Sequence, residues 1–326
     1  MYADYYKLTT MPFQLTPDGQ FFFGSREHSR AMAHLVYGLA QEEGFIVITG
    51  EIGAGKTMLV ERLWSQLDQR KYVAVRLLTT QLGGDDLLRM VVAGFGLSAP
   101  GEDKASLLQR LERHFTDQQR SGRRCLLVVD EAQNLPIGAL EELRMLSNIT
   151  IGGRAPFQGV LLGQPQFRHM LAGEELEQLR QRVLASYHLG PLDAAETRAY
   201  IEHRLTTAGW SGLPSFEEAA FATIHRHTDG IPRRINTLCS RLLLFGALDE
   251  TTHITEAIAD EVADELRRDL AGKSAAARTV REPVANGEPR SSVEARLNRV
   301  EASLKRHDRI IKSAVEIGVQ LLERTR

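Results

Sequence analysis

Cysteine is scarce in this sequence, which excludes a fold held together by disulfide bonds. The chain of 326 residues contains two cysteines, Cys125 and Cys239, and both lie in apolar surroundings. Isolated cysteines of this kind are typical of small core residues in a protein from a reducing compartment. We therefore expect neither a disulfide nor a metal site from this pair.

Long hydrophobic runs are also missing. No apolar stretch approaches the roughly 18 residues that a bilayer-spanning helix requires. The first residues, MYADYYKLTT, lack the charged and then apolar layout of a signal peptide. We therefore expect a cytoplasmic protein, either free in the cytoplasm or peripheral at the inner face of the cytoplasmic membrane.

A strong net charge is the third absence. The whole chain carries a formal net charge of −2, which argues against a protein that binds nucleic acid over its entire surface. The charge is unevenly placed, because residues 271–326 contain twelve Lys and Arg against seven Asp and Glu. This segment therefore carries +5 and the remainder of the chain carries −7.

What the sequence does contain is a glycine-rich motif. The segment FIVITGEIGAGKTMLV fits the pattern G-x-x-x-x-G-K-[ST], and an apolar strand before it and a helix after it supply the context that this motif requires. Gly53 is a further glycine inside the loop and strengthens the match. The residues expected to bind a nucleotide are Gly50, Glu51, Ile52, Gly53, Ala54, Gly55, Lys56, Thr57 and Met58.

The chemistry of this motif follows from its geometry. Glycines allow consecutive backbone N–H groups to point into one concavity, and the amino end of the following helix adds partial positive charge there. We expect Lys56 to reach the β- and γ-phosphates of ATP and the Thr57 hydroxyl to ligate Mg²⁺. The sequence therefore predicts a site for ATP and Mg²⁺.

An acidic motif follows a later apolar run. In RRCLLVVDEAQNL the apolar stretch is continuous, as expected for a strand buried on both faces, and Asp130 stands at its carboxyl end. Ligands bind at this end of the strands in open α/β sheets. We therefore expect Asp130 to hold Mg²⁺ and Glu131 to polarise the attacking water.

Alternation of strands and helices predicts the fold class. Apolar runs at residues 71–77, 157–163 and 183–189 provide further strands, with helical segments between them. This order is typical of an α/β protein with a parallel sheet and helices on both faces. Gln164 follows one of the strands, where a polar side chain can orient water or sense the γ-phosphate; a plain turn residue is the alternative.

Arginines in two places are candidates for contact with the nucleotide. Arg180 and Arg182 precede the last strand, and they are either a solvated pair or an arginine finger offered to a neighbouring subunit. Arg233 and Arg234 begin a helix, where they oppose the helix dipole unless an anion faces them. The side chains expected to take part in hydrolysis are Glu131, Lys56, Gln164, Arg182, Arg180 and Arg233.

After residue 191 the sequence predicts helices only. Asp193 with Glu196 forms a capping pair before one helix, and Ser215 with Glu218 predicts the same device before the next. Pro232 opens a third helix and a fourth follows, so we expect a small helical bundle.

Together these motifs resemble the AAA+ ATPases of the ExeA and MshM type, the family of general secretion pathway protein A. The likeness rests on the glycine-rich loop and on LLVVDEAQNL, LLGQPQF, LRQRV and GIPRRIN, and the opening segment up to residue 39 looks similar too. Within that family the chain looks most like the ATPase associated with XrtA (exosortase)/PEP-CTERM loci. The resemblance covers roughly residues 1–270.

The resemblance implies a P-loop NTPase core of the AAA+ type with a five-stranded sheet of order 5-1-4-3-2, followed by an all-α lid. It implies Gln164 as sensor 1, Arg233 as sensor 2, and Arg182 or Arg180 as the arginine finger between subunits of a homo-oligomer. It places residues 24–28, GSREH, near the adenine. It also implies partners among envelope export or secretion proteins at the cytoplasmic membrane.

The domain boundaries follow from changes in composition. We expect an AAA+ ATPase core at residues 1–191, a helical lid at 192–271 and a flexible linker at 272–292, which is small and polar with Pro and Gly. Residues 293–326 carry a heptad-like apolar stripe, which predicts a coiled coil or docking helix with a coiled-coil partner. The alternatives are a basic amphipathic helix on anionic lipid and a free helix.

The first 23 residues are rich in aromatic side chains. In a terminal segment such residues favour packing onto the domain, and here one or two of them are also expected to touch the nucleobase. The residues in question are Tyr2, Tyr5, Tyr6, Phe13, Phe21, Phe22 and Phe23.

These observations favour an ATPase that binds and hydrolyses Mg-ATP to drive or regulate the assembly of an envelope export system, of the exopolysaccharide and exosortase kind or of the type II secretion and pilus-like kind. The alternatives are a DNA-handling AAA+ ATPase of the transposition or replication type and a nucleotide-gated scaffold. The −7 charge before residue 271 does not suit a phosphate-tracking surface, so we do not expect DNA as the partner.

Overall fold

The structure is a computed structural model that describes residues 2–78, 84–98, 101 and 103–279. The chain divides into two compact units, residues 1–268 and 269–326. The glycine-rich loop, the acidic motif and most of the predicted lid lie in the first unit. Among the helices of the described ranges, none combines the length and the hydrophobicity that crossing a membrane requires.

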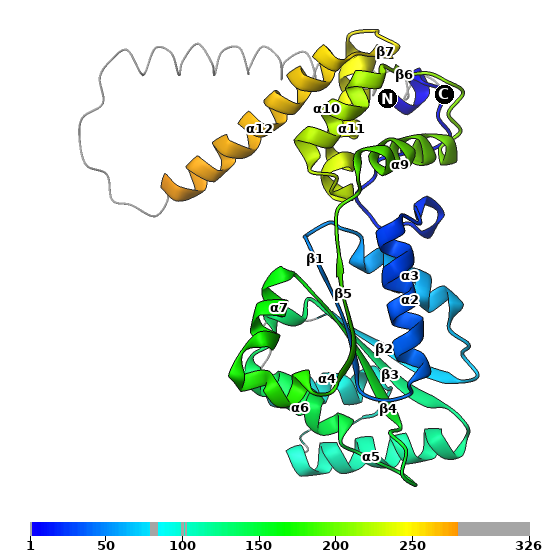
Figure 1. The fold of residues 1–326 in the computed structure, drawn as a ribbon, viewed down its shortest axis with the longest axis vertical. Coiled ribbons are helices and arrows are strands. Elements are labelled where there is room, and N and C mark those ends of the chain that lie inside the picture. The colour runs from blue at the N-terminus through cyan, green and yellow to red at the C-terminus, as the bar shows by residue number, and fades with distance from the viewer. Residues whose placement is uncertain (1, 79–83, 99–100, 102, 280–326) are drawn as a thin grey trace, which may run out of the picture. The chain divides into compact units, whose positions relative to one another are not determined.

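A five-stranded parallel sheet organises the amino-terminal part of the first unit (Figure 1). Its spatial order is β2-β3-β4-β1-β5, which confirms the predicted order 5-1-4-3-2. Because every neighbouring pair is parallel, all the carboxyl ends of the strands lie at one edge of the sheet. The strands are β1 (Phe45–Gly50), β2 (Tyr72–Leu78), β3 (Arg124–Asp130), β4 (Phe157–Gly163) and β5 (Val183–Leu189).

Burial explains the sequence pattern of the strands. The central strands β1 and β4 are buried along their whole length, and β3 is buried from its second residue onward. A strand covered on both faces reads as a continuous apolar run, as these do. The edge strands β2 and β5 are only partly buried, so their sequences include polar residues such as Arg76 and His188.

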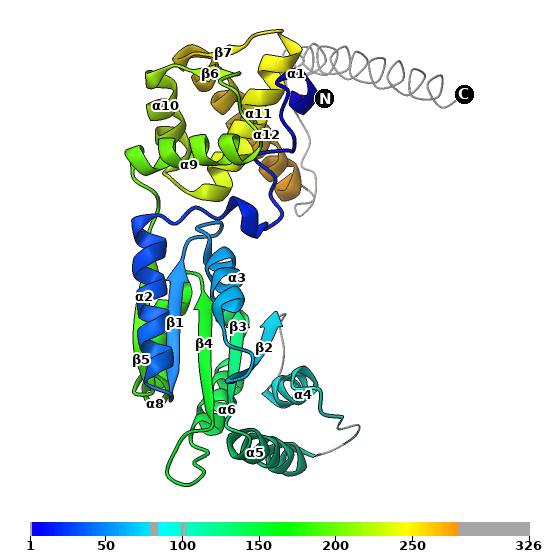
Figure 2. The same ribbon diagram turned by 90° about the vertical axis from the view of Figure 1, so that its right-hand side faces the viewer.

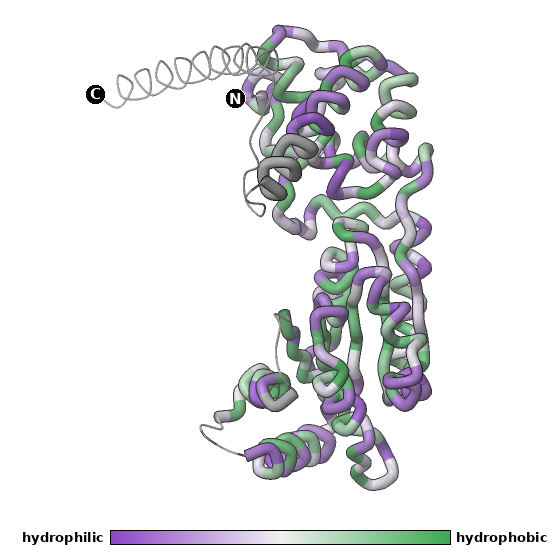
Figure 3. Tube along the Cα trace, turned by 90° about the vertical axis from the view of Figure 1, so that its left-hand side faces the viewer, coloured by the Kyte–Doolittle hydropathy of each residue, from purple (hydrophilic) through white to green (hydrophobic). Residues whose placement is uncertain are grey.

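Helices cover both faces of the sheet, as predicted (Figure 2). One face packs against α2 (Arg26–Ala40) and α3 (Lys56–Gln66). Figure 3 shows hydrophilic and hydrophobic residues alternating along α4 (Gly84–Gly94) and α5 (Lys104–Arg120), as expected of amphipathic helices. The opposite face packs against α4 (Gly84–Gly94), α5 (Lys104–Arg120), α6 (Ile137–Ser147), α7 (Pro165–Ala172) and α8 (Glu177–Arg180). Single 3-10 turns lie at η1 (Gly19–Phe21), η2 (Ala132–Asn134) and η3 (Glu174–Leu176).

The lid contains the four predicted helices and a short parallel pair of strands. The capping box of Asp193 and Glu196 is confirmed, with both reciprocal hydrogen bonds present. The predicted cap at Ser215 is wrong, because Ser215 lies in a strand and its hydroxyl meets His253 Nδ1 at 2.8 Å. The elements are α9 (Ala194–Thr207), β6 (Ser215–Phe216), α10 (Glu218–Thr228), α11 (Pro232–Leu248), β7 (His253–Ile254) and α12 (Glu256–Thr279).

The predicted linker begins too early. Helix α12 continues to Thr279, so the first part of residues 272–292 is helical. The three alanines of the run SAAA near this end are good helix formers, and they favour a helix in a segment that composition alone predicts to be flexible. The rest of the predicted linker and the predicted coiled coil at 293–326 lie outside the described residues, so both stay predictions.

The first residues of the chain belong to the interior of the lid. We call residues 2–23 the N-terminal strap, which includes helix α1 (Tyr2–Tyr5). The Tyr6 hydroxyl donates to the Thr251 carbonyl at 3.1 Å, and the Thr9 N–H donates to the Ala208 carbonyl at 2.9 Å. The predicted packing role is therefore confirmed for four of the seven aromatics, although these fill the lid core rather than a surface of the ATPase core. The strap aromatics buried in the lid are Tyr2, Tyr6, Phe13 and Phe21.

Replacing Tyr6 by Ala should test this packing. The ring is 2% exposed within the lid core, so Tyr6→Ala is expected to lower the free energy of unfolding by about 3–5 kcal/mol. The neighbouring Tyr5 is 39% exposed, and Tyr5→Ala should change it by no more than about 1 kcal/mol. Urea unfolding of both variants measures the difference. If Tyr6→Ala lowered the free energy of unfolding no more than Tyr5→Ala does, the strap would not contribute to the core of the lid.

Candidate nucleotide-binding site

The glycine-rich loop joins the carboxyl end of β1 to the amino end of α3. Strand β1 ends at Gly50 and the helix begins at Lys56, so the loop occupies the edge of the sheet where ligands bind in α/β folds. Gly53 and Gly55 have φ values of +84° and +101°, which favour glycine. The first N–H groups of α3, which lack partners inside the helix, lie next to this loop, as an anion-binding turn requires.

The glycines are also needed because other groups occupy the space of a side chain. A Cβ atom at Gly50 would lie 2.8 Å from the Leu189 carbonyl oxygen, and one at Gly55 would lie 2.5 Å from His28 Nε2. A Cβ at Gly53 would collide with the side chain of Arg233 from the lid. The loop is thus a cradle of bare backbone, and this arrangement fits a bound polyphosphate.

Lys56 lies in the cradle. Its side chain donates to the carbonyl oxygens of Gly50 at 2.8 Å and Glu51 at 3.0 Å, and the residue is only 6% exposed. Burial lowers the pKa of Lys56, while the negative charges of Glu131 and Asp130 oppose this shift. The ammonium group is therefore held by neutral carbonyls of its own loop.

Two carboxylates follow β3 at the same edge of the sheet. Asp130 is 4% exposed, and its Oδ2 accepts from Arg76 Nη2 at 2.8 Å while its Oδ1 accepts from the Glu131 N–H at 3.0 Å. Glu131 adopts φ +53° and ψ +42°, a left-handed conformation that is uncommon for a residue with a side chain. Non-glycine residues in this conformation concentrate at functional sites, where the surrounding structure holds them.

Two glutamine amides hold the Glu131 carboxylate. Its Oε2 accepts from Gln133 Nε2 at 2.5 Å and from Gln164 Nε2 at 3.0 Å, and the Gln164 N–H donates to Gln133 Oε1 at 2.9 Å. Burial raises the pKa of Glu131, but these hydrogen bonds and the charges of Lys56 and Arg233 outweigh it, so the pKa falls below its usual range. The group is therefore an ionised, oriented acceptor near the loop.

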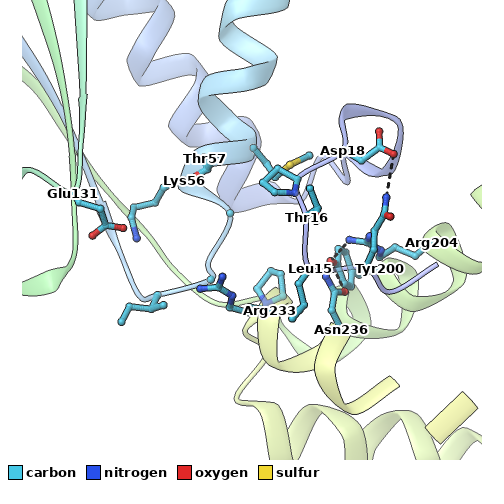
Figure 4. A pocket seen from close by; sticks show the side chains of 17 residues that line it. Leu15, Thr16, Asp18, Lys56, Thr57, Glu131, Tyr200, Arg204, Arg233 and Asn236 are labelled. Atoms are coloured by element: carbon cyan, nitrogen blue, oxygen red, sulfur yellow. Dashed lines mark hydrogen bonds between the residues drawn. The ribbon is translucent and has the colours of Figure 1, made fainter. Parts of the chain in front are cut away.

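A pocket opens over these groups between the loop, the strap and the lid (Figure 4). Figure 4 shows the side chains of Lys56 and Glu131 pointing toward each other on one side of it. Strap residues 14–18 form another wall, and lid residues form the rest. The lid residues that line the pocket are Tyr200, Arg204, Pro232, Arg233 and Asn236.

Arg233 is the lid residue nearest to the loop. Its backbone N–H donates to the Gly53 carbonyl at 3.2 Å, so the first turn of α11 rests directly on the cradle. Arg234 instead forms an ion pair with Asp229 at 2.5 Å on an exposed surface. The structure therefore brings Arg233, Lys56 and Glu131 together around the pocket, whereas Arg234 does not line it. Gln164 does not line it either but lies next to it, through its hydrogen bond to Glu131.

Arg180 and Arg182 lie elsewhere. Arg182 precedes the amino end of β5, next to Phe45 at the start of β1, whereas the pocket lies at the carboxyl ends of these strands. Arg182 donates to Asn148 Oδ1 at 2.7 Å, and Arg180 donates to the Ala172 carbonyl at 3.0 Å. Both arginines therefore lie outside the residues that line the pocket of their own chain.

His28 of the segment GSREH lies against the loop. Ser25 caps α2 by accepting from the His28 N–H, and its hydroxyl also meets His28 Nδ1 at 2.7 Å. Burial lowers the pKa of His28, so it presents an uncharged ring beside Gly55. A smaller cavity next to the pocket is lined by His28, Met58, Pro232 and the three phenylalanines of residues 21–23.

Sequence reasoning missed a polar group of the lid. The buried Arg204 donates to the Tyr200 hydroxyl at 2.9 Å and to the Pro12 carbonyl of the strap, and Tyr200 donates to Asn236 Oδ1 at 2.8 Å. Burial raises the pKa of Tyr200. The available signal was weak, because polar residues in amphipathic lid helices normally face solvent, and no local motif relates Pro12 to Arg204.

Comparison with known proteins agrees with this geometry. Residues 39–171 match the family model described as an AAA domain. General secretion pathway protein A of Aeromonas hydrophila is 39% identical over 245 residues, which cover 75% of this chain and 44% of that protein. The chain thus spans less than half the length of this relative.

Solved structures share the fold at low sequence identity. The Aeropyrum pernix ORC2 protein, in ADPNP-ADP complexes, gives a TM-score of 0.59 at 14% identity over 78% of this chain and 71% of its own. The Thermotoga maritima RuvB Holliday junction branch migration motor gives 0.52 at 17% identity over 78% and 73%. The chain therefore has the AAA+ α/β fold of P-loop NTPases, and its AAA domain is related to general secretion pathway protein A.

The contact between Gly53 and the lid can be tested with an alanine. Gly53→Ala adds a methyl group that collides with Arg233 at a positive φ, so it should lower the free energy of unfolding by about 2–4 kcal/mol and weaken nucleotide binding. Gly122→Ala is the matched control, because Gly122 has φ +73° but open space around it. Chemical unfolding and a fluorescent-nucleotide titration measure both effects. The cradle has no steric requirement at Gly53 if the two variants behave alike.

Proposed function

We propose that this chain binds ATP with Mg²⁺ and hydrolyses it to ADP and phosphate, and that this cycle drives or regulates the assembly of an envelope export system. The observation that carries the ATPase proposal is the ionised Glu131 carboxylate, which two glutamine amides hold beside the bare-backbone cradle of Lys56. The proposed export role rests on the 39% identity to general secretion pathway protein A.

Nucleotide binding is assigned to residues 50–58. In this proposal the N–H groups of the loop bind the phosphates, and Lys56 exchanges the carbonyls of Gly50 and Glu51 for phosphate oxygens. The neighbouring cavity around His28 and Phe22 suits the nucleobase, because it is lined by aromatic and apolar groups.

The metal is assigned to Thr57 and Asp130. A hydroxyl and a carboxylate are oxygen donors of the kind that Mg²⁺ prefers, and phosphate oxygens and water complete its ligands in such sites. When bound, the ion neutralises charge on the β- and γ-phosphates. Thr57 stands in the first turn of α3 and Asp130 at the end of β3, so both reach the same edge of the sheet.

Water activation is assigned to Glu131 and sensing to Gln164. The lowered pKa of Glu131 keeps the carboxylate ionised at neutral pH, as an acceptor of the hydrogen bond from water requires. Gln164 already contacts Glu131, so a change at the γ-phosphate can reach the carboxylate through this amide. This arrangement supports the sensor 1 role of Gln164.

Arginines complete the proposed site. Arg233 contacts the loop through its backbone and lines the pocket, which supports its role as the sensor of the lid. Arg182, or Arg180, would serve as the arginine finger in the site of a neighbouring copy. This assignment makes the active form a homo-oligomer.

The cellular role is proposed from the relative and from the resemblance of the sequence motifs. We assign the chain to the ExeA and MshM type, nearest to the ATPase associated with exosortase/PEP-CTERM loci, and the export machinery is either of the exopolysaccharide and exosortase kind or of the type II secretion and pilus-like kind. The partners would be export or secretion proteins at the cytoplasmic membrane, reached from the cytoplasm. A coiled-coil partner would bind through residues 293–326.

Two substitutions separate binding from hydrolysis. Lys56→Ala removes the cation of the cradle and should weaken ATP binding by at least about 100-fold, a scale typical of a charged phosphate contact. Glu131→Gln keeps the shape of the side chain but not its charge, so it should bind ATP like the wild type while turnover falls by about 10²–10⁴-fold.

The measurements are a fluorescent-nucleotide titration and release of inorganic phosphate. Thermal unfolding without nucleotide serves as the control for correct folding of both variants. Normal turnover by Glu131→Gln would contradict the role of Glu131 in water activation. Normal ATP affinity of Lys56→Ala would contradict the proposed nucleotide-binding site.

The arginine finger predicts complementation between subunits. Arg182→Ala chains have an intact cradle and Lys56→Ala chains have an intact finger, so mixing the two inactive variants should restore part of the ATPase rate. Phosphate release is measured across mixing ratios, with each variant alone as the control. Absence of recovery at every ratio, for this variant and for Arg180→Ala, would favour a site built within one chain.

A further inference from the structure

One arginine next to the proposed metal site is shared by two carboxylates. Arg76 Nη2 donates to Asp130 Oδ2 at 2.8 Å, and Arg76 Nη1 donates to Glu61 Oε1 at 2.6 Å. Asp130 is the proposed metal-binding carboxylate, whereas Arg76 and Glu61 have no part in the function proposed above. The Arg76 guanidinium is therefore hydrogen-bonded to the same carboxylate that is expected to bind a divalent cation.

Strand register and helix periodicity bring these three residues together. Arg76 of β2 pairs with Val128 of β3, so both side chains point to the sheet face that α3 covers. Asp130 lies two residues after Val128 and points to the same face. Glu61 lies four residues after Thr57 on α3, which places it one helix turn behind the proposed metal-binding hydroxyl.

The two ion pairs differ in their exposure. The side chain of Asp130 is 6% exposed and that of Arg76 is 22% exposed, whereas that of Glu61 is 49% exposed. A shielded carboxylate needs a nearby cation, because removal of an isolated charge from water is costly. Arg76 supplies that cation at Asp130, and Glu61 offers it a second, solvated acceptor.

The geometry is not that of a tight structural ion pair. A guanidinium that serves one carboxylate commonly donates two parallel hydrogen bonds to it, but Arg76 gives one nitrogen to each acid. Its Nε is buried without a hydrogen-bond partner. Arg76 is thus bound to Asp130 by a single hydrogen bond and has an alternative acceptor already in contact.

We propose that Arg76 is a built-in counter-cation of the metal site, which competes with Mg²⁺ for Asp130 and is retained by Glu61 when the metal binds. This inference rests on the proposed function, since it takes Asp130 and Thr57 as metal ligands. Two cations near one carboxylate repel each other, so Arg76 raises the Mg²⁺ concentration that is needed for the metal to bind. Glu61 lowers that Mg²⁺ concentration, because its negative charge partly neutralises Arg76 on the solvent side.

The proposal predicts effects of opposite sign for two neutral substitutions. Arg76→Gln removes the competing charge, so the Mg²⁺ concentration for half-maximal binding of a fluorescent ADP analogue should fall about tenfold. Glu61→Gln leaves Arg76 with Asp130 as its remaining acid, so that concentration should rise about threefold. In the double variant the effect of Glu61→Gln should vanish, because the charge that it compensates is gone.

Matched variants separate this role from general changes. Arg70→Gln removes an exposed positive charge from the turn before β2 and should leave the Mg²⁺ requirement unchanged. Arg76→Lys keeps the charge and should stay close to the wild type. Binding of the analogue in EDTA and thermal unfolding without metal verify that each variant is folded, and Glu61→Gln tests the proposal by itself if Arg76→Gln does not fold.

The outcomes distinguish this inference from the function on which it rests. If Mg²⁺ does not change analogue binding by the wild-type chain, the proposed metal site fails. If Mg²⁺ strengthens wild-type binding but Arg76→Gln raises the required concentration, Arg76 only positions Asp130 and the counter-cation role is overturned. An unchanged requirement in Arg76→Gln, or a lower one in Glu61→Gln, overturns it as well.

Discussion

The contact between the first turn of α11 and the glycine-rich loop constrains the whole site. The Arg233 N–H donates to the Gly53 carbonyl, and the Arg233 side chain fills the space that a side chain at Gly53 would need. At this position the lid rests on the backbone of the loop, and residues of both domains line the pocket. The backbone of the loop is thus hydrogen-bonded directly to the first turn of a lid helix.

The charges of the site are each held by their own partners. Lys56 rests on two carbonyls, Glu131 on two glutamine amides and Asp130 on Arg76. Separate support of this kind keeps each group oriented without requiring an ion pair between Lys56 and the carboxylates. Such preorganisation lowers the reorganisation needed when a ligand replaces the present partners.

The sequence predicts best what is local. The continuous apolar runs of β1, β3 and β4, the spacing of the glycine loop and the capping box of Asp193 each depend on residues close together in the chain, and the structure has them. It also places Gln164 beside Glu131, because the carboxyl ends of adjacent parallel strands meet at one edge.

Contacts between distant segments were beyond sequence reasoning. The packing of Tyr6 in the lid joins residues 245 positions apart, and the bond from Arg204 to Pro12 spans 192. Serine is a residue type that often caps helices, but the Ser215 hydroxyl hydrogen-bonds to His253 in β7 instead. Tertiary contacts decided each of these positions, and a local pattern carries no information about them.

The strap has a mechanical consequence for the lid. Since apolar residues of the strap pack in the lid core and the chain then enters α2, the lid is joined to the sheet domain by two chain crossings, at residues 22–25 and 190–193. Polar contacts bind the crossings to each other, from Arg26 to Asp193 at 3.2 Å and from the Gly190 N–H to Glu27 at 3.3 Å. A lid held by two neighbouring connections has fewer ways to move relative to the sheet domain than a lid held by one connection.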